Sequence, residues 1–315
     1  MSRQNGYSKD WSAYWASGAL TSLPQDFRAN YEGEIAELWK DQCDGLPEAP
    51  RILDICTGNG AVALLLAQCL EAAGLSGQIV AVDAARLDTG QLARRWPDLA
   101  GVLERIEFIG QQPFESFTPK DGAFDLLASQ YGIEYCDWAA AAERAFSLLR
   151  PGGRLAMINH APDSSMLETM RAEQRDYVVV DDSQAPKLIR RWLEGSLSLP
   201  DLQQRLGRAE QVLRQALKRK PSPLLEQVWR STAQIMRGSA RELAAHRTAI
   251  GEFLDQVSAG AGRLENMLRV NEAIERQPAW TDVFVDAGLE AVSEREIVYQ
   301  GRERVGCARV FVRPD

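Results

Sequence analysis

Five short apolar runs alternate with amphipathic helical segments between residues 51 and 161. Most of the runs are apolar on both faces, which is typical of parallel strands covered by helices on both sides of a sheet. Strands that alternate with helices predict a doubly wound α/β fold with right-handed crossovers. The runs are Arg51–Cys56, Gln78–Asp83, Ile106–Ile109, Phe124–Ser129 and Arg154–Asn159.

A long region without this alternation follows the fifth run. Between about 163 and 277, leucines recur at heptad-like spacing and β-branched runs are few, which predicts several amphipathic helices. Leu199-Pro200 and Pro221-Ser222-Pro223 interrupt the pattern, because proline breaks a helix from within. The sequence therefore predicts a helical insertion over 163–277.

Strand-like sequence returns after residue 278. A helical segment ends at Gly288, and strands are expected at Glu290–Tyr299 and Arg304–Val312, joined by a short connection that contains Gln300-Gly301. Such a connection is typical of an antiparallel hairpin. The complete pattern predicts an α/β, doubly wound, mostly parallel seven-stranded sheet with a C-terminal antiparallel hairpin and a helical insertion before the last two strands.

Three regions are therefore expected: a helical N-terminal segment at 1–48, an α/β domain formed by 49–162 and 278–315, and the insertion at 163–277. The insertion carries a net charge of +2 and the remainder −10. We expect the N-terminal segment and the insertion to fold over the carboxyl edge of the sheet as a lid that excludes water and selects the substrate. The N-terminal segment is rich in aromatic residues, namely Trp11, Tyr14, Trp15, Phe27, Tyr31 and Trp39.

Composition limits the partners and the compartment. The net charge of −8 disfavours general binding to nucleic acid or to an anionic membrane. Five scattered cysteines without CxxC spacing indicate a reduced compartment, and two histidines argue against a His-rich metal site. The N-terminus has no signal-type apolar stretch, and the longest apolar run, Ala61–Ala67, is too short to cross a bilayer. We expect a soluble cytoplasmic protein with a small-molecule substrate, no nucleic-acid or membrane partner and no metal; a homodimer is left open.

The first apolar run leads into a glycine-containing turn, Leu53-Asp54-Ile55-Cys56-Thr57-Gly58-Asn59-Gly60, and then into a helix. Glycines let the backbone approach a ligand closely, and a helix N-terminus offers free N–H donors and positive potential. The turn resembles motif I of class I S-adenosylmethionine-dependent methyltransferases, an acidic residue followed by three alternating glycines.

The resemblance has consequences for individual positions of the turn. Asp54 occupies the acidic position, Gly58 and Gly60 the second and third glycines, and Cys56 stands where the first glycine usually lies, so the turn must tolerate a small side chain there. The resemblance implies that S-adenosylmethionine is the cofactor, that Asp54 lies near its methionine ammonium, and that the turn contacts it through Thr57, Gly58, Asn59 and Gly60.

A second interpretation of the turn is a dinucleotide site. Gly58-Asn59-Gly60-Ala61-Val62-Ala63 also fits GxGxxG/A, and Asp83 follows about 20 residues later. Asp83 ends the second run next to Ala84, where its carboxylate can accept hydrogen bonds from ribose hydroxyls of either cofactor or cap the next turn. A turn that binds no ligand is the third interpretation.

The third run is followed by Gln111, Gln112 and Phe114. Many class I methyltransferases carry an acid here that contacts the adenine amino group. A glutamine can replace that acid, since its carbonyl accepts a hydrogen bond from the amino group and its amide donates to a ring nitrogen. Phe114 lies against adenine in one interpretation and in the hydrophobic core in the other.

The fourth run, Phe124–Ser129, is followed by Gln130-Tyr131-Gly132-Ile133-Glu134 and resembles motif IV of the same family. We expect Ser129 and Gln130 to face the cofactor, and Tyr131 and Glu134 to face the substrate; helix packing is the alternative for Tyr131. The segment lacks Asn/Asp-Pro-Pro-aromatic, which counts against methylation of adenine amino groups or glutamine amides by the usual arrangement.

Two further features complete the resemblance. Leu148-Leu149-Arg150-Pro151-Gly152-Gly153 ends a helix just before the fifth run, and the terminal hairpin is typical of the same Rossmann-like methyltransferases. The resemblance covers about 51–161 and 278–313. His160 ends the fifth strand at the carboxyl edge, where an imidazole with a pKa of about 6.5 could accept a proton from the substrate, or simply hydrogen-bond within the fold.

The sequence favours a methyltransferase that acts on a small-molecule oxygen, nitrogen or carbon nucleophile. One alternative keeps the chemistry with RNA or protein as substrate, supported by the basic cluster Arg214, Lys218, Arg219 and Lys220. Another is a regulatory protein that binds S-adenosylmethionine without catalysis, and the last is an NAD-dependent oxidoreductase.

Overall fold

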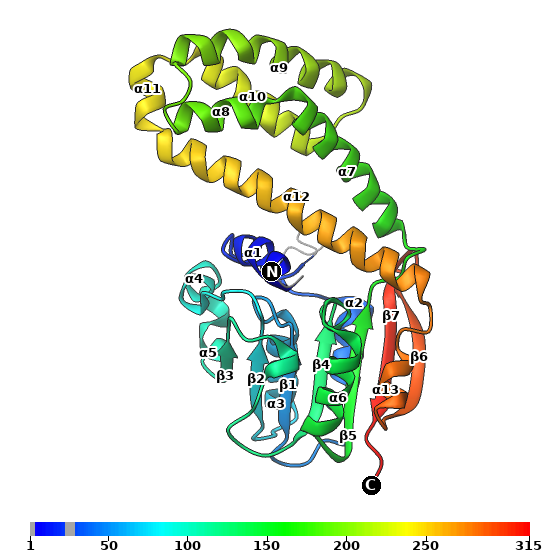
Figure 1. Cartoon of the computed structure of the whole chain (residues 1–315). Coiled ribbons are helices and arrows are strands. Elements are labelled where there is room, and N and C mark those ends of the chain that lie inside the picture. The colour runs from blue at the N-terminus through cyan, green and yellow to red at the C-terminus, as the bar shows by residue number, and fades with distance from the viewer. Residues whose placement is uncertain (1–3, 23–28) are drawn as a thin grey trace. The chain divides into compact units, whose positions relative to one another are not determined.

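A single sheet organises the larger part of the chain, whose computed structural model describes residues 4–22 and 29–315 (Figure 1). The strands are β1 (Arg51–Ile55), β2 (Gln78–Val82), β3 (Ile106–Ile109), β4 (Phe124–Gln130), β5 (Leu149–Asn159), β6 (Glu290–Tyr299) and β7 (Glu303–Val312). Their order across the sheet is β3-β2-β1-β4-β5-β7-β6. The neighbours among β1 to β5 pair in parallel, and β7 runs antiparallel to β5 and β6. The predicted sheet and its terminal hairpin are confirmed.

Helices cover both faces of this sheet, because each buried strand sends alternate apolar side chains to opposite sides. Ile52 and Leu126 belong to the core on one face, and Leu53 and Leu127 to the core on the other. The first face packs against α2 (Gly33–Asp41), α3 (Ala61–Ala72), α4 (Thr89–Arg95) and α5 (Ala100–Leu103), and the second against α6 (Trp138–Leu148) and α13 (Asp282–Asp286) (Figure 1).

The start of β5 differs from the sequence prediction. Helix α6 ends at Leu148, and β5 begins directly at Leu149, so the Pro-Gly-Gly segment lies inside an irregular start of the strand, beside a register shift in β4. A Cβ atom on Gly153 would come within 2.9 Å of the Arg150 carbonyl oxygen and 3.0 Å of the Phe124 carbonyl oxygen. Position 153 therefore requires glycine because neighbouring backbone leaves no space for a Cβ atom, and not because a helix ends there.

The N-terminal segment contains α1 (Gln4–Trp15) and leads to α2, whose Trp39 is fully buried. Of the aromatic residues that the sequence places in this segment, Phe27 lies outside the described residues. Trp11, Tyr14 and Trp15 form a cluster of rings, including a stacked pair of Trp11 and Trp15 with ring centroids 5.6 Å apart.

The chain divides into two compact units, one of Met1–Leu167 with Asn266–Asp315 and the other of Glu168–Glu265. The helices of the insertion are α7 (Ser165–Ser183), α8 (Ala185–Leu193), α9 (Leu199–Arg219), α10 (Pro223–Arg237), α11 (Ala240–Ala245) and α12 (Arg247–Arg276). Ser198 and Ser222 cap α9 and α10, each followed by a proline in the first turn, which is the arrangement that helix N-termini prefer. No helix within the described residues is both long and apolar enough to cross a membrane.

Candidate functional site

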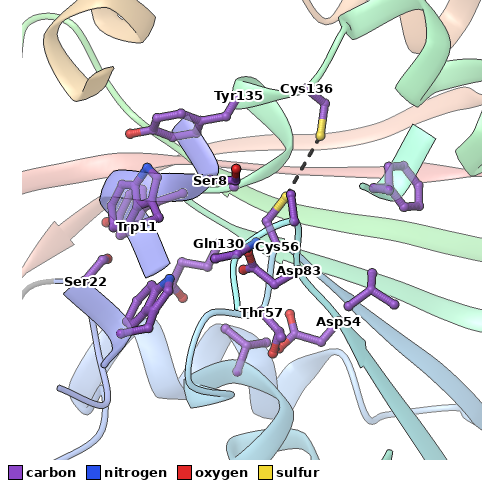
Figure 2. Close-up of a pocket in the computed structure, with 18 of the residues that line it drawn as sticks. Ser8, Trp11, Ser22, Asp54, Cys56, Thr57, Asp83, Gln130, Tyr135 and Cys136 are labelled. Carbon is purple, nitrogen blue, oxygen red and sulfur yellow. Dashed lines mark hydrogen bonds between the residues drawn. The ribbon is translucent and has the colours of Figure 1, made fainter. Parts of the chain in front are cut away.

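A pocket opens at the carboxyl ends of β1, β2 and β4, where the strand order reverses between β1 and β4. Ligands of open α/β sheets bind at such a switch point. The cavity volume is about 110 Å³, roughly ten times what one water molecule occupies on this measure. The pocket is lined by Tyr7, Ser8, Trp11, Trp15, Leu20, Ser22, Tyr31, Asp54, Cys56, Thr57, Ala61, Val62, Val82–Ala85, Gln112–Glu115, Gln130–Gly132, Tyr135 and Cys136 (Figure 2).

Asp54 is a buried carboxylate at the end of β1, with an exposed fraction of 1%. Its Oδ2 accepts hydrogen bonds from Thr57 Oγ1 at 2.5 Å and from the backbone N–H of Ala63 at 3.1 Å. Burial raises the pKa of Asp54 to about 7, although these two hydrogen bonds act in the opposite direction. A positively charged group in the pocket would therefore favour the ionised form of Asp54.

Asp83 is the second buried carboxylate, at the end of β2. It accepts hydrogen bonds from the backbone N–H groups of Gly58 and Ala85, both at 2.7 Å. Burial raises the pKa of Asp83, and the two backbone hydrogen bonds oppose this shift. Asp83 thus joins the glycine turn after β1 to the end of β2, and it lines the pocket together with its predicted neighbour Ala84.

The glycine turn is covered by the end of α1. Gly58 and Gly60 have φ angles of 55° and 83°, and a Cβ atom on Gly58 would lie 2.3 Å from the indole of Trp15. The Asn59 amide donates to the backbone carbonyls of Trp15 and Ala19. Thr57 lines the pocket, whereas Gly58, Asn59 and Gly60 do not. Their predicted contact with a cofactor stays a prediction.

Three residues other than glycine have left-handed backbone at this edge of the sheet. Cys56, Gln111 and Tyr131, with φ angles of 56°, 58° and 51°, each lie within two residues of the end of β1, β3 or β4. This conformation costs of order 1 kcal/mol for such residues and is concentrated at functional sites. Cys56 thus adopts the conformation that a glycine favours, although it carries a side chain.

Gln130 presents an amide to the pocket from the end of β4 (Figure 2). Its Oε1 accepts a hydrogen bond from the indole Nε1 of the fully buried Trp39 at 2.6 Å. Because an indole only donates, this bond fixes which end of the amide faces Trp39. The Gln130 Nε2 is buried and has no hydrogen-bond partner within the described residues, so an acceptor on a ligand would satisfy it.

Of the other residues predicted to bind the cofactor, two line the pocket and two do not. Gln112 and Phe114 line the pocket, and the Gln112 amide donates to Pro113 O and Ser116 Oγ. Gln111 and Ser129 are not among the lining residues. Ser129 Oγ donates to Ile55 O at 3.1 Å and accepts from Ile133 N at 3.0 Å, so its hydroxyl links β1 to the segment that follows β4.

Of the three residues predicted to act on the substrate, Tyr131 lines the pocket and Glu134 and His160 do not. Glu134 accepts hydrogen bonds from His160 N and Asn159 Nδ2, and burial raises its pKa. The His160 ring is stacked on Tyr131 with centroids 4.8 Å apart, and burial lowers the pKa of His160 to about 4. His160 reaches the pocket through Tyr135, whose hydroxyl lies 3.2 Å from His160 Nε2.

Aromatic side chains of α1 form a wall of the pocket; they belong to the N-terminal segment that was expected to cover this edge, but they were not among the predicted site residues. Tyr7, Trp11 and Trp15 follow at intervals of four residues, a spacing that places them on one helical face and could have identified them. Trp11 stacks on Trp15 and meets Tyr135 edge to face at 5.9 Å; Figure 2 shows Trp11 and Tyr135 next to each other. The described lining residues include Asp54, Asp83 and Glu115 but no Lys, Arg or His.

Comparisons with known proteins identify the domain that carries this pocket. Residues 52–153 match the family model described as "Methyltransferase domain". A release factor glutamine methyltransferase from Chlorobaculum tepidum is 38% identical over 114 residues, and a demethylmenaquinone methyltransferase from Thermus thermophilus is 32% identical over 119 residues. Residues 52–153 form a class I methyltransferase domain. The resemblance to this family, and with it S-adenosylmethionine as the cofactor, is confirmed.

The two curated relatives match only about a third of this chain. The matched segments cover 35% and 37% of this chain, and 36% and 50% of the two curated relatives. Among solved structures, the 1,6-didemethyltoxoflavin-N1-methyltransferase of Burkholderia thailandensis aligns with a TM-score of 0.46 and 11% identity over 100% of this chain and 92% of that chain.

Within the described residues, no group of three His, Cys, Asp or Glu side chains is arranged to hold a metal ion.

Proposed function

We propose that the chain transfers a methyl group from S-adenosylmethionine to an oxygen, nitrogen or carbon nucleophile of a small molecule. The observation that carries this proposal is one pocket with two different sides. On one side two buried carboxylates lie at the ends of β1 and β2, and on the other side aromatic rings from α1 and Tyr135 form a cover.

The polar groups of the pocket fit the cofactor. Asp54, buried and with its pKa raised to about 7, gains a counter-charge from the cofactor's ammonium. The unsatisfied Gln130 Nε2 is a donor for a carboxylate oxygen, and Asp83 is an acceptor for ribose hydroxyls. Gln112 and Phe114 remain for the adenine. S-adenosylmethionine supplies a methyl group on a sulfonium with a good leaving group, so the protein's main tasks are to position the nucleophile and exclude water.

The lining of the pocket narrows the class of acceptor. An anionic substrate is normally held by Arg or Lys, and the described lining residues include none, whereas they include three carboxylates. Rings from Tyr7, Trp11 and Tyr135 offer flat apolar surface and the faces that attract cations. These features favour a neutral or cationic acceptor. The Tyr135 hydroxyl, 3.2 Å from His160 Nε2, would hydrogen-bond the acceptor at this wall.

The N-terminal segment and the insertion keep their proposed role as a cover. Support for the first is that α1 contributes Tyr7, Ser8, Trp11 and Trp15 to the pocket. For the insertion, the test is limited trypsin digestion with and without S-adenosylhomocysteine. A cover predicts slower cleavage within 163–277 when the ligand is present, and an unchanged rate would contradict that role.

Calorimetric titration with S-adenosylmethionine, S-adenosylhomocysteine and NAD tests the cofactor. The proposal predicts micromolar dissociation constants for both adenosyl ligands and none measurable for NAD, after which neutral and cationic acceptors are screened for methyl transfer. Preference for NAD would overturn the proposal. Tight binding of the adenosyl ligands without turnover on a broad acceptor panel would favour a regulatory protein.

A macromolecular acceptor is the second candidate. The basic cluster Arg214, Lys218, Arg219 and Lys220 lies at the end of α9, where all four residues are exposed. A salt-dependent RNA gel shift that is lost when these four residues are neutralised would favour RNA as the substrate.

A further inference from the structure

Two cysteines face each other in the wall of the pocket. Cys56 follows β1 in the glycine turn, and Cys136 follows the short 3₁₀ helix Ile133–Tyr135 after β4. Their Sγ atoms are 3.9 Å apart (Figure 2). Both residues are partly exposed and both line the pocket, so a small reagent that enters the pocket reaches both thiols.

This arrangement needs little change to become a covalent link. A disulfide has an S–S distance of about 2.05 Å, so rotation of the two side chains has to shorten the separation by about 2 Å. The backbone on both sides is already fixed by neighbouring contacts. Cys56 has a left-handed backbone with φ of 56°, and a Cβ atom on Gly132 would lie 2.5 Å from the Cys56 Cβ. Because Gly132 has no side chain, the segment after β4 can approach the turn after β1 this closely.

We propose that Cys56 and Cys136 are a modification site that forms a reversible disulfide with hydrogen peroxide as the oxidant, and that this disulfide closes the pocket to the cofactor. Two S–H bonds break and one S–S bond forms. The two electrons and two protons reduce the peroxide, whose O–O bond breaks to give two water molecules. A thiol reductant returns both cysteines to thiols by thiol–disulfide exchange and is itself oxidised to a disulfide. The effect on the cofactor rests on the proposed function, whereas formation of the disulfide does not.

The link would act on the cofactor through the turn that carries Cys56. This residue lies two positions after Asp54 and two before Gly58, whose N–H is held by Asp83. A bond to Cys136 ties this turn to the segment after β4 across the pocket wall. The space beside the turn then changes, while the sheet below stays intact.

The surroundings of the thiols set the conditions for oxidation. The hydrogen bond between Cys56 and Cys136, together with burial, raises the pKa of Cys56. For Cys136 the hydrogen bond to Cys56 lowers the pKa, but burial and the charges of Glu115, Glu134 and Asp83 leave it raised. Because the thiolate is the reactive form, oxidation should be slow at neutral pH and faster as the pH rises.

The experiment treats the full chain with hydrogen peroxide at pH 8.5, followed by intact mass, peptide mapping and titration with S-adenosylhomocysteine. The proposal predicts a loss of two hydrogens, a cross-linked peptide pair that contains Cys56 and Cys136, and roughly tenfold or greater loss of affinity that dithiothreitol restores. Cys136→Ser should lose the cross-link and the response of affinity to peroxide, relative to its own untreated form. Cys69→Ser, a matched cysteine change outside the pocket, should keep both.

The outcomes separate this inference from the proposed function. Absence of the Cys56–Cys136 cross-link in the mapped peptides would overturn the modification site, and a cross-link without loss of affinity would overturn its effect on the pocket. If the untreated protein fails to bind S-adenosylhomocysteine, the proposed cofactor is contradicted, and the cross-linked peptide still decides whether the disulfide forms.

Discussion

Two sides of the sheet's carboxyl edge, one that lines the pocket and one behind Tyr131 and Tyr135, are held in place by different kinds of bond. On the β1–β2 side, Asp83 and Asp54 accept hydrogen bonds mainly from backbone N–H groups. On the β4–β5 side, Glu134 and His160 belong to a network that includes the side chains of Asn159 and Tyr135. A carboxylate that accepts from backbone N–H groups can lose its charge with little change in the structure around it. In a network of side chains, a change in one member displaces the others. Mutations on the β1–β2 side should therefore mainly change cofactor affinity, and mutations on the β4–β5 side should mainly change the free energy of unfolding.

Asp54→Asn gives the largest expected effect. An amide oxygen can still accept from Thr57 and Ala63, but the charge that faces a cofactor ammonium is lost, so affinity for S-adenosylmethionine should fall about 10- to 100-fold. Because burial raises the pKa of Asp54 to about 7, the native state binds more protons than the unfolded state between the ordinary pKa and about 7. Its contribution to stability is therefore lost as pH rises through this window.

The same variant should accordingly be more heat-stable than the wild type at pH 8 when no ligand is present. Calorimetry and thermal unfolding at pH 8 and pH 5 measure the two effects. Asp88→Asn is the matched control, since an exposed asparagine still caps α4. A ligand-free Asp54→Asn protein that melts below the wild type at pH 8 would contradict the distinction between the two sides.

Glu134→Gln should show the reverse pattern. The carboxylate accepts from His160 N and Asn159 Nδ2, and a glutamine amide offers an oxygen to one of these donors and an N–H group to the other. The free energy of unfolding should fall by about 1–3 kcal/mol, measured by urea denaturation, with less than about threefold change in cofactor affinity. A large loss of affinity at unchanged stability would assign Glu134 to the binding side.

Trp39→Phe tests the hydrogen bond that orients the Gln130 amide at the end of β4. It keeps a buried ring but removes the donor to Gln130 Oε1, which frees the amide to rotate. Affinity for S-adenosylmethionine should fall about fivefold, the equivalent of one hydrogen bond. Affinity for 5′-methylthioadenosine, which lacks the amino-acid part, should stay the same. Trp229→Phe, which removes the indole donor to Glu210, is the control, and equal losses for both ligands would refute the role of Gln130.

The smallest effect concerns the pH dependence of His160. Burial lowers its pKa to about 4, so the unfolded state binds the proton more readily than the native state. Stability from this residue is complete above its ordinary pKa of about 6.5 and is lost as pH falls toward 4. His160→Asn should flatten the loss of stability over this window. In the wild type, kcat/KM should show no step from His160 between pH 6 and pH 9, and a step near pH 6.5 that His160→Asn removes would disprove this assignment.

The sequence predicts those features of the fold that depend on neighbouring residues. Apolar runs predicted the strands, and the bounds of β6 match the prediction, Glu290–Tyr299. Asp54 was predicted near the cofactor because its turn resembles motif I, and Asp83 because it ends the second strand beside that turn; both line the pocket. Three contacts depend on packing between segments that are distant in the sequence. They are Trp39 with Gln130, Trp15 with Gly58, and Cys56 with Cys136. No local pattern encodes those distances, and the burial of His160 is hidden for the same reason.

The stacked indoles of Trp11 and Trp15, 5.6 Å apart in the wall of the pocket, give the protein an optical property. Electronic transitions of two rings at this distance couple, so the pair should contribute a signal to the near-ultraviolet circular dichroism spectrum that Trp11→Phe removes. A molecule that enters the pocket changes the separation or the polarity around the rings and thereby this signal. Libraries of unlabelled compounds could then be screened for acceptors by spectroscopy, before any product of the reaction has been identified.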